Sequence, residues 1–326
     1  MKEGLLALVV NFAIALIISP FIIKWLRKLK FGQNILIYVE KHKEKSGTPT
    51  MGGVVFIIST VITYLIFWNK NNLFATVTIM SLVFFGVVGF FDDFIKIKFK
   101  QNEGLKPYQK IIAQLGIAIV IAIFSYRSSL VGSFVFLPFT NKLVDFGWLI
   151  IPFIIVFYLA VVNSVNLIDG LDGLCSKVSI VVFIVSAIII YITSLNFAGV
   201  YFEEITNLVS VTFLFVGGLL AFTLYNGFPA KVFMGDTGSL AIGGFMASLF
   251  VFSKNYLLMP IVGCAYLITA ISVIIQVVVF KITKKRVFKM APLHHHFEQT
   301  YHEAKVTHGY VVMSIIIGLL TIILYV

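Results

Sequence analysis

Long, uninterrupted runs of apolar residues recur along the whole chain. Most are about 17 to 23 residues long, which is the length a helix needs to cross roughly 30 Å of hydrocarbon. A lipid-facing β-barrel is excluded because its strands would alternate polar and apolar residues. The pattern predicts an all-α polytopic membrane protein, one domain over residues 1–326, with about ten transmembrane helices near 4–24, 53–69, 73–91, 109–126, 147–163, 177–195, 205–223, 239–253, 257–280 and 308–325.

Composition and charge add an orientation to this picture. Hydrophobic residues make up 60% of the chain and charged residues only 12%, which excludes a soluble domain. Twenty of the 25 Lys and Arg lie in the loops 24–52, 92–110, 164–177, 224–238 and 281–307. The positive-inside rule therefore places these loops in the cytoplasm and both termini outside. The net charge of +11 is mostly this topology signal and requires no nucleic acid.

One polar segment is expected on the outer side. Residues 127–146, "RSSLVGSFVFLPFTNKLVDF", are too broken by Gly132, Pro138 and Asn141 to span a membrane. Apolar residues alternate around "PFTN", and this pattern predicts a short β-hairpin.

Acidic residues gather where apolar runs end on the predicted cytoplasmic side. Asp92, Asp93, Asp169 and Asp236 all lie at such ends. An ionisable group at the edge of hydrocarbon costs a few kcal/mol, so these groups are expected to line a hydrated cleft or to bind something. The chemistry of the chain is therefore predicted at a cleft that opens to the cytoplasm.

The stretch "NSVNLIDGLDGL" carries four of the polar groups at a spacing of three. Asn163, Asn166, Asp169 and Asp172 would form one polar stripe that rotates slowly around a helix, facing Asp92, Asp93 and Asp236. Gly residues at 170 and 173 interrupt that helix. The alternative interpretation is a capped helix end.

Four further stretches are ambiguous singly. Asp92 and Asp93 stand beside five lysines, 96, 98, 100, 106 and 110, and a solvated helix end is the alternative. "GDTGS" around Asp236 and "KSGTPTMGG", which begins at Lys45, suit turns that hold phosphate, or plain turns. In "LHHHFE", His294 and His295 favour hydrogen bonding to phosphate or sugar over a zinc site. Carboxylates, lysines and Gly-rich turns on one face together indicate Mg²⁺-dependent phosphoryl chemistry with one soluble and one lipid substrate.

The ordered stretches "KSGTPTMGG", "FFDDFIK", "GLKPYQK", "NSVNLIDGLDGL", "NGFPAKVFMGDTGSL" and "APLHHHFE" closely resemble the bacterial phospho-N-acetylmuramoyl-pentapeptide transferases, also called translocase I. The paired Asp and the Asn-x-x-Asp-x-x-Asp stretch are shared with the wider polyprenyl-phosphate N-acetylhexosamine-1-phosphate transferase superfamily. The triple His followed by Phe-Glu, and the first-loop "SGTPTMGG", single out the muramoyl branch.

The resemblance implies a homodimer in the bacterial plasma (inner) membrane that works in peptidoglycan synthesis. It implies Mg²⁺-dependent transfer of phospho-MurNAc-pentapeptide from UDP-MurNAc-pentapeptide to undecaprenyl phosphate, which forms lipid I and releases UMP. It implies Asp236 as Mg²⁺ ligand, with Asp92 and Asp93 next to the metal or the lipid phosphate. The remaining implied site residues are Asn166, Asp169 and Asp172 on the nucleotide-sugar, Phe233 on uracil, and Lys45, Thr50, Gln276, Ala291, His294 and His295 along the pocket.

Lys96 and Lys106, together with Lys45, are expected to contact the acids in the empty site, because they share their side of the membrane. For the mechanism, charge neutralisation and alignment are favoured, with Asp93 as a base in a minor role and an aspartyl-phosphate route left open. An intramembrane prenyltransferase is disfavoured by Lys96 after the paired Asp. A secondary transporter is disfavoured because it would place its acids mid-span.

Overall fold

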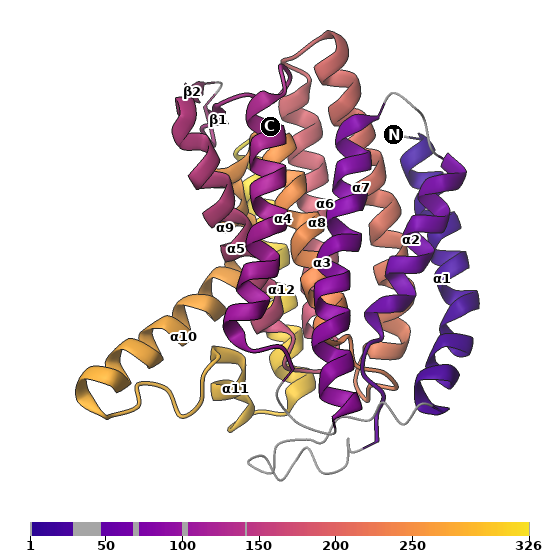
Figure 1. Ribbon diagram of the computed structural model, residues 1–326, viewed down its shortest axis with the longest axis vertical. Coiled ribbons are helices and arrows are strands. Elements are labelled where there is room, and N and C mark those ends of the chain that lie inside the picture. Colours follow the sequence, from indigo (N-terminus) through magenta and orange to yellow (C-terminus); the bar gives the residue numbers. More distant parts are fainter. Residues whose placement is uncertain (1, 29–46, 68–71, 100–103, 141, 326) are drawn as a thin grey trace.

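The computed structural model describes residues 2–28, 47–67, 72–99, 104–140 and 142–325. Lys45 and the first-loop residues before Gly47 lie outside this described part. Helices dominate it, and they run mostly side by side in one bundle (Figure 1). The elements are α1 (Lys2–Lys28), α2 (Gly53–Phe67), α3 (Leu73–Lys98), α4 (Pro107–Arg127), β1 (Phe134–Phe136), β2 (Leu143–Asp145), η2 (Gly147–Leu149), α5 (Ile150–Ile168), α6 (Leu174–Ser194), α7 (Gly199–Asn226), α8 (Gly235–Phe252), η3 (Tyr256–Leu258), α9 (Met259–Val262), α10 (Cys264–Thr283), α11 (Leu293–Glu298) and α12 (Glu303–Ile323).

Nine helices of the described residues are long and apolar enough to cross a membrane. The predicted run 53–69 corresponds to α2, which has 15 residues and is shorter than these nine. The predicted run 257–280 is divided at Gly263 into the short η3 and α9 and the long α10. These helices confirm an all-α polytopic membrane protein.

Both chain ends lie toward the same end of the bundle, as the ten predicted crossings would require (Figure 1). The ring of Tyr325, next to the C-terminus, lies 5.3 Å from the ring of Phe139 in the hairpin loop. The long helix α10 instead projects away from the bundle toward the opposite end, where α11 lies.

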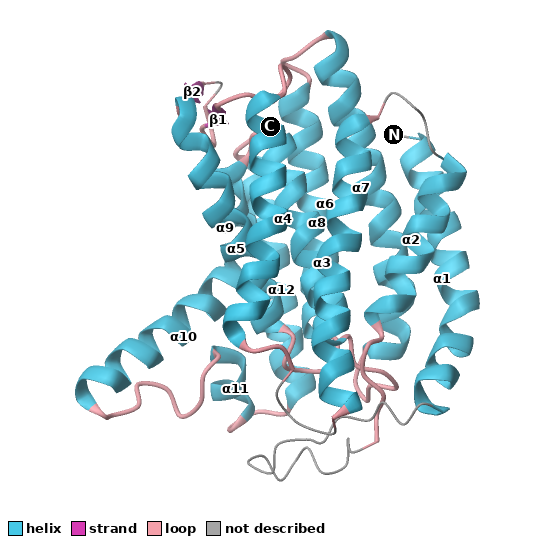
Figure 2. Cartoon of the chain, in the orientation of Figure 1, coloured by secondary structure: helices cyan, strands magenta, loops and turns pink. Residues whose placement is uncertain are grey.

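The predicted hairpin is confirmed (Figure 2). Strands β1 and β2 pair antiparallel, with Phe134 opposite Asp145 and Phe136 opposite Leu143. The Asp145 carboxylate accepts hydrogen bonds from the Ser133 hydroxyl and the Gly147 N–H, which lowers its pKa. The Phe136 N–H donates to the Lys254 carbonyl, and this bond ties the hairpin to the chain after α8.

Helix α8 is the most enclosed of the candidate spans, with 89% of its apolar window buried. It packs along α3 at very short range because Gly89 lies directly against the backbone of Asp236 and Thr237. Further along the pair, the Ser81 hydroxyl donates to the Gly244 carbonyl at 2.9 Å. The last turns of α3 and the first turn of α8 are thereby held together.

The other end of α3 is held by α7. Asn72 precedes α3 but makes no side-chain cap. The buried Glu204 carboxylate of α7 instead accepts the N–H groups of Leu73 and Phe74, at 2.9 and 2.8 Å. A negative charge at the first turn of a helix satisfies free donors and complements the helix dipole.

Candidate active site

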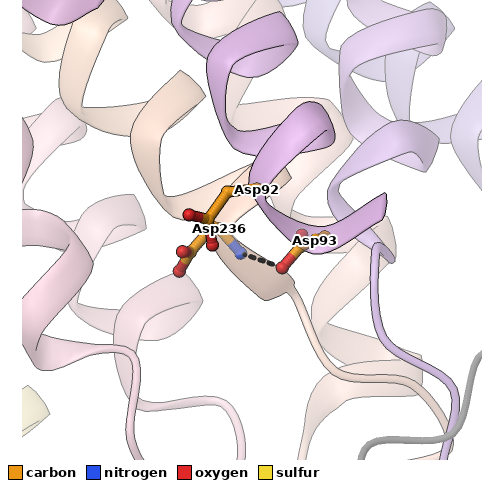
Figure 3. A group of neighbouring side chains, drawn as sticks. All are labelled: Asp92, Asp93 and Asp236. Atoms are coloured by element: carbon orange, nitrogen blue, oxygen red, sulfur yellow. Dashed lines mark hydrogen bonds between the residues drawn. The ribbon is translucent and has the colours of Figure 1, made fainter. Parts of the chain in front are cut away.

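Three carboxylates meet where α3 ends and α8 begins (Figure 3). Asp92 and Asp93 come from α3, and Asp236 comes from the first turn of α8. Each offers one oxygen, and these three oxygens lie within 4.8 Å of one another. Carboxylate oxygens from two rigid helices fit the ligand preference of Mg²⁺. The sequence prediction that these acids come together is confirmed.

The two adjacent aspartates have different partners. Asp93 is 1% exposed and accepts the N–H of Asp236 at 3.2 Å, the N–H of Thr237 at 2.9 Å and the Thr237 hydroxyl at 2.7 Å. It therefore caps α8 from another helix. Asp92 accepts the Leu105 N–H at 3.0 Å and so holds the turn that leads into α4.

Asp236 is reached by polar groups from three helices. Gly235 before it has a φ of +74°, a left-handed conformation that favours glycine and turns the chain into α8. Asp236 Oδ1 accepts the Asn166 amide at 2.7 Å, and Oδ2 lies 3.0 Å from the ammonium groups of both Lys96 and Lys110.

The prediction of which lysines contact the carboxylates is confirmed only in part. Lys96 contacts the acids as expected, at 2.5 Å from Asp92. The second lysine is Lys110 rather than Lys106. Lys106 is exposed at the start of α4, where its N–H is bound by the Gln109 side chain at 3.0 Å.

The predicted polar stripe is interrupted. Helix α5 ends at Ile168, and Gly173, with a φ of +69°, reverses the chain before α6. Asn163 pairs with Gln114 and Asn166 with Asp236, but Asp172 accepts the Ala230 N–H at 2.9 Å. The expectation of one continuous stripe from 163 to 172 is therefore corrected, since the glycine turn redirects its second half.

His294 and His295 pack against this turn. Gly170 lies directly against the imidazole of His294, and a Cβ at Gly170 would come 2.8 Å from His295 Nε2. His295 Nδ1 contacts Glu298 at 2.8 Å. Burial and the negative charges of Asp236, Asp93 and Asp172 raise the pKa of the neighbouring Asp169 well above its ordinary value. The histidine stretch and the Asp169 turn thus lie side by side.

His294 is expected to make the protein sensitive to mild acid. Burial and the nearby His295 lower its pKa from 6.5 to about 3, so the folded state keeps the ring neutral while the unfolded chain binds a proton. Stability is then lost as the pH falls below about 6.5. Between about pH 7.5 and about pH 5, the melting temperature of His294→Phe should fall less than that of the wild type. The exposed His308→Gln serves as control and should follow the wild type; equal falls in all three would contradict the assignment.

Two of the remaining predicted residues lie beside Asp236. The half-buried Phe233 donates its N–H to the Pro49 carbonyl and accepts the Gly52 N–H, both at 2.8 Å. The buried Thr50 lies in the same paired segment, and a Cβ at Gly235 would come 2.8 Å from its hydroxyl. The first-loop motif and the "GDTGS" motif therefore form one structural unit.

Gln276 and Ala291 shape the projecting α10–α11 segment. Gln276 Oε1 accepts the N–H groups of Val287 and Phe288 at 3.1 and 2.9 Å. Ala291 precedes Pro292, the N-cap of α11, which carries His294. The described contacts of Gln276 stay within this segment, so its bearing on the carboxylate cluster is through the placement of α11.

Sequence reasoning did not single out Lys110 and Thr237 as site residues. Lys110 was one of five lysines in a row of candidates, and nothing local distinguished it. Thr237 follows Asp236, and its hydroxyl donates to Asp93 of α3. The packing of α8 against α3 reveals the role of Thr237, and the packing of α4 beside α8 reveals that of Lys110.

Comparison with known proteins identifies the family of the chain. Residues 74–254 match glycosyl transferase family 4, and residues 45–57 match phospho-N-acetylmuramoyl-pentapeptide-transferase signature 1. A phospho-N-acetylmuramoyl-pentapeptide-transferase of Clostridium novyi (strain NT) is 43% identical over 316 residues, which cover 96% of this chain and 94% of the relative. The chain belongs to the phospho-N-acetylmuramoyl-pentapeptide-transferase family.

Other phospho-N-acetylmuramoyl-pentapeptide-transferases are equally similar along their length. The protein of Clostridium botulinum (strain Alaska E43 / Type E3) is 44% identical over 95% of this chain and 93% of its own. That of Thermoanaerobacter pseudethanolicus (strain ATCC 33223 / 39E) is 43% identical over 97% and 96%. The family-4 match includes Asp92, Asp93 and Asp236, so the carboxylate cluster lies inside the region shared by these transferases.

Proposed function

We propose that this membrane transferase moves phospho-MurNAc-pentapeptide from UDP-MurNAc-pentapeptide to undecaprenyl phosphate, with Mg²⁺, and so forms lipid I and UMP. The observation that carries the proposal is the cluster of Asp92, Asp93 and Asp236 with two lysines at one end of the helical bundle. Membership of the phospho-N-acetylmuramoyl-pentapeptide-transferase family supports the choice of substrates.

The proposed reaction is a phosphoryl transfer without redox change. A phosphate oxygen of the lipid attacks the phosphorus that carries the sugar. The bond from this phosphorus to the oxygen bridging the two phosphates breaks, and UMP leaves with that oxygen. The second pKa of a phosphate monoester lies near 6, so the lipid phosphate is already largely dianionic and needs no strong base.

The residues would act by alignment and charge neutralisation. Bound Mg²⁺ would supply positive charge to the diphosphate, held by Asp236 with Asp92 and Asp93. Lys96 and Lys110 would offset the repulsion between the two anionic substrates. Because both Asp93 oxygens accept hydrogen bonds from the first turn of α8, we assign Asp93 mainly to the positioning of Asp236.

The nucleotide-sugar would lie between the carboxylates and the histidines. Asn166 lies in the last turn of α5, and Asp169 and Asp172 lie in the following turn, where Gly170 contacts His294. Both ring nitrogens of His294 lack a hydrogen-bond partner among the described residues. A neutral ring can accept and donate one hydrogen bond each, which suits a sugar or phosphate group. The proposed pocket is completed by the remaining residues that the resemblance and the loop charges indicate, which are Lys45, Thr50, Lys106, Gln276, Ala291 and His295.

The proposed setting is the bacterial plasma (inner) membrane. The cleft would face the cytoplasm, because the carboxylates lie at the end of the bundle opposite the two termini, which the loop charges place outside (Figure 1). A homodimer is part of the proposal and follows from the family resemblance alone.

Replacement of Phe233 by Ala is expected to weaken UDP binding. Loss of stacking on uracil costs roughly 1–3 kcal/mol, or about 5- to 150-fold in affinity. Phe228→Ala is the matched control, because Phe228 lies in the same loop and packs edge-on against His302 at 4.8 Å. Calorimetric titration with UDP measures both. An unchanged affinity in Phe233→Ala would remove Phe233 from the pocket.

Release of UMP from UDP-MurNAc-pentapeptide by purified protein in detergent tests the function directly. Release should require both Mg²⁺ and undecaprenyl phosphate. Release without the lipid would indicate hydrolysis instead of transfer. No release under any of these conditions, from a folded protein, would overturn the proposal. It would favour the alternative interpretation as a secondary transporter.

A further inference from the structure

The ammonium group of Lys96 lies among all three carboxylates. Its Nζ is 2.5 Å from Asp92 Oδ2, 3.9 Å from Asp93 Oδ1 and 3.0 Å from Asp236 Oδ2. The oxygens that could ligate a metal lie within 4.8 Å of one another. The ammonium group therefore occupies the small volume that a divalent ion would need.

Lys110 adds a second cation at the same oxygen. Its Nζ is 3.0 Å from Asp236 Oδ2 and 3.3 Å from Asn166 Oδ1. The other oxygen of Asp236 accepts the Asn166 amide at 2.7 Å. Both oxygens of Asp236 are thus engaged by groups of the protein itself.

A divalent ion and these ammonium groups exclude each other at Asp236. Mg²⁺ binds carboxylate oxygens at about 2.0–2.1 Å. An ammonium group has three N–H donors and no lone pair, so it cannot serve as a ligand, and two cations at such short range repel strongly. The lysines can move away because each carries its charge on a flexible four-carbon stem.

We propose that Lys96 and Lys110 are internal countercations that a divalent ion must displace from Asp236, and that phosphate oxygens of the nucleotide-sugar receive the displaced ammonium groups. The second half rests on the proposed function. Binding of the metal and binding of the nucleotide phosphates would then be positively coupled through the lysines, in addition to any direct contact between metal and phosphate. Such coupling is reciprocal, so either ligand raises the affinity for the other by the same factor.

Mn²⁺ binding without nucleotide tests the first half. Mn²⁺ is detected by electron paramagnetic resonance, so metal affinity is measured apart from turnover. Lys96→Met should bind Mn²⁺ at least about fivefold more tightly than the wild type, because no ammonium competes. Lys98→Met is the matched control and should leave the affinity unchanged. Lys98 lies two residues further along α3, is exposed and contacts the rings of Phe94 and Phe99 instead of the acids.

Lys110→Met provides a second variant in case the three neighbouring acids without Lys96 prevent folding. It leaves Lys96 in place and should also tighten Mn²⁺ binding. The inference is overturned if the folded variants bind Mn²⁺ no more tightly than the wild type, or if Lys98→Met tightens binding to the same extent.

UDP binding in the presence of EDTA tests the second half. Here the affinity of Lys96→Met is expected to fall, whereas its affinity for Mn²⁺ is expected to rise. Lys96→Met should bind UDP more weakly than the wild type, whereas binding of uridine, which has no phosphate, should not change. Tighter Mn²⁺ binding with unchanged UDP binding would overturn the transfer of the lysines to phosphate. A wild type that binds no UDP either in EDTA or with Mg²⁺ would instead contradict the proposed function, and the Mn²⁺ measurement would still decide the countercation role.

Discussion

Asp236→Asn is expected to lower turnover on the order of 10²–10³-fold, the loss typical when a key electrostatic contact in an active site is removed. The replacement keeps the shape of the side chain and removes the charge on which Asn166, Lys96 and Lys110 converge. The change lies in a polar turn outside the packed core, so the protein should remain folded.

The measurement is UMP release over a range of Mg²⁺ concentrations, with size-exclusion chromatography and melting in detergent as checks of folding. Glu203→Gln is the matched control, since it removes an exposed carboxylate far from the cluster. Turnover at the wild-type rate with the wild-type Mg²⁺ dependence would rule out Asp236 as a metal ligand.

Gly89→Ala is expected to reduce activity as severely, although it removes no polar group. A Cβ at this position would overlap the Asp236 carbonyl and press on the Thr237 N–H. The first turn of α8 would have to move away from α3, and the three bonds from it to Asp93 would lengthen or break. Overpacking of this kind costs about 1–3 kcal/mol, so the melting temperature should fall too.

Gly116→Ala separates this effect from the ordinary preference of helices for alanine. Gly116 lies in α4 with nothing within 4 Å of its Cβ position. Its replacement should leave activity unchanged and be neutral or slightly stabilising, since Gly in a helix costs roughly 0.5–1 kcal/mol relative to Ala. Full activity in Gly89→Ala would mean that the α3–α8 contact can relax without harm to the site.

Patterns that depend on local chemistry predicted much of this structure. Apolar runs of membrane length predicted the helices, because hydrocarbon thickness alone sets that length. The turn "PFTN" between alternating residues predicted the hairpin. Acids at the ends of runs predicted the cluster of Asp92, Asp93 and Asp236, since burial of charge at such positions needs a compensating reason.

Features that depend on packing between distant segments could not be predicted. Lys106 and Lys110 are one helical turn apart and chemically equal. The choice between them follows from the point where α4 begins, which the bond from Leu105 to Asp92 helps to fix. Likewise, a spacing of three from Asn163 to Asp172 describes a stripe only while the helix lasts, and α5 ends at Ile168.

The two ends of α3 are anchored to different neighbours, by Glu204 of α7 at its start and by Asp93 to α8 at its end. A piston movement of α3 along its axis would break charged hydrogen bonds at both ends at once. The hydrogen bonds at its two ends therefore fix the position of α3 along its axis. The carboxylates that α3 carries are thus held at one height in the bundle, while the projecting α10 and the short α11 are not part of this fixed pair of contacts (Figure 1).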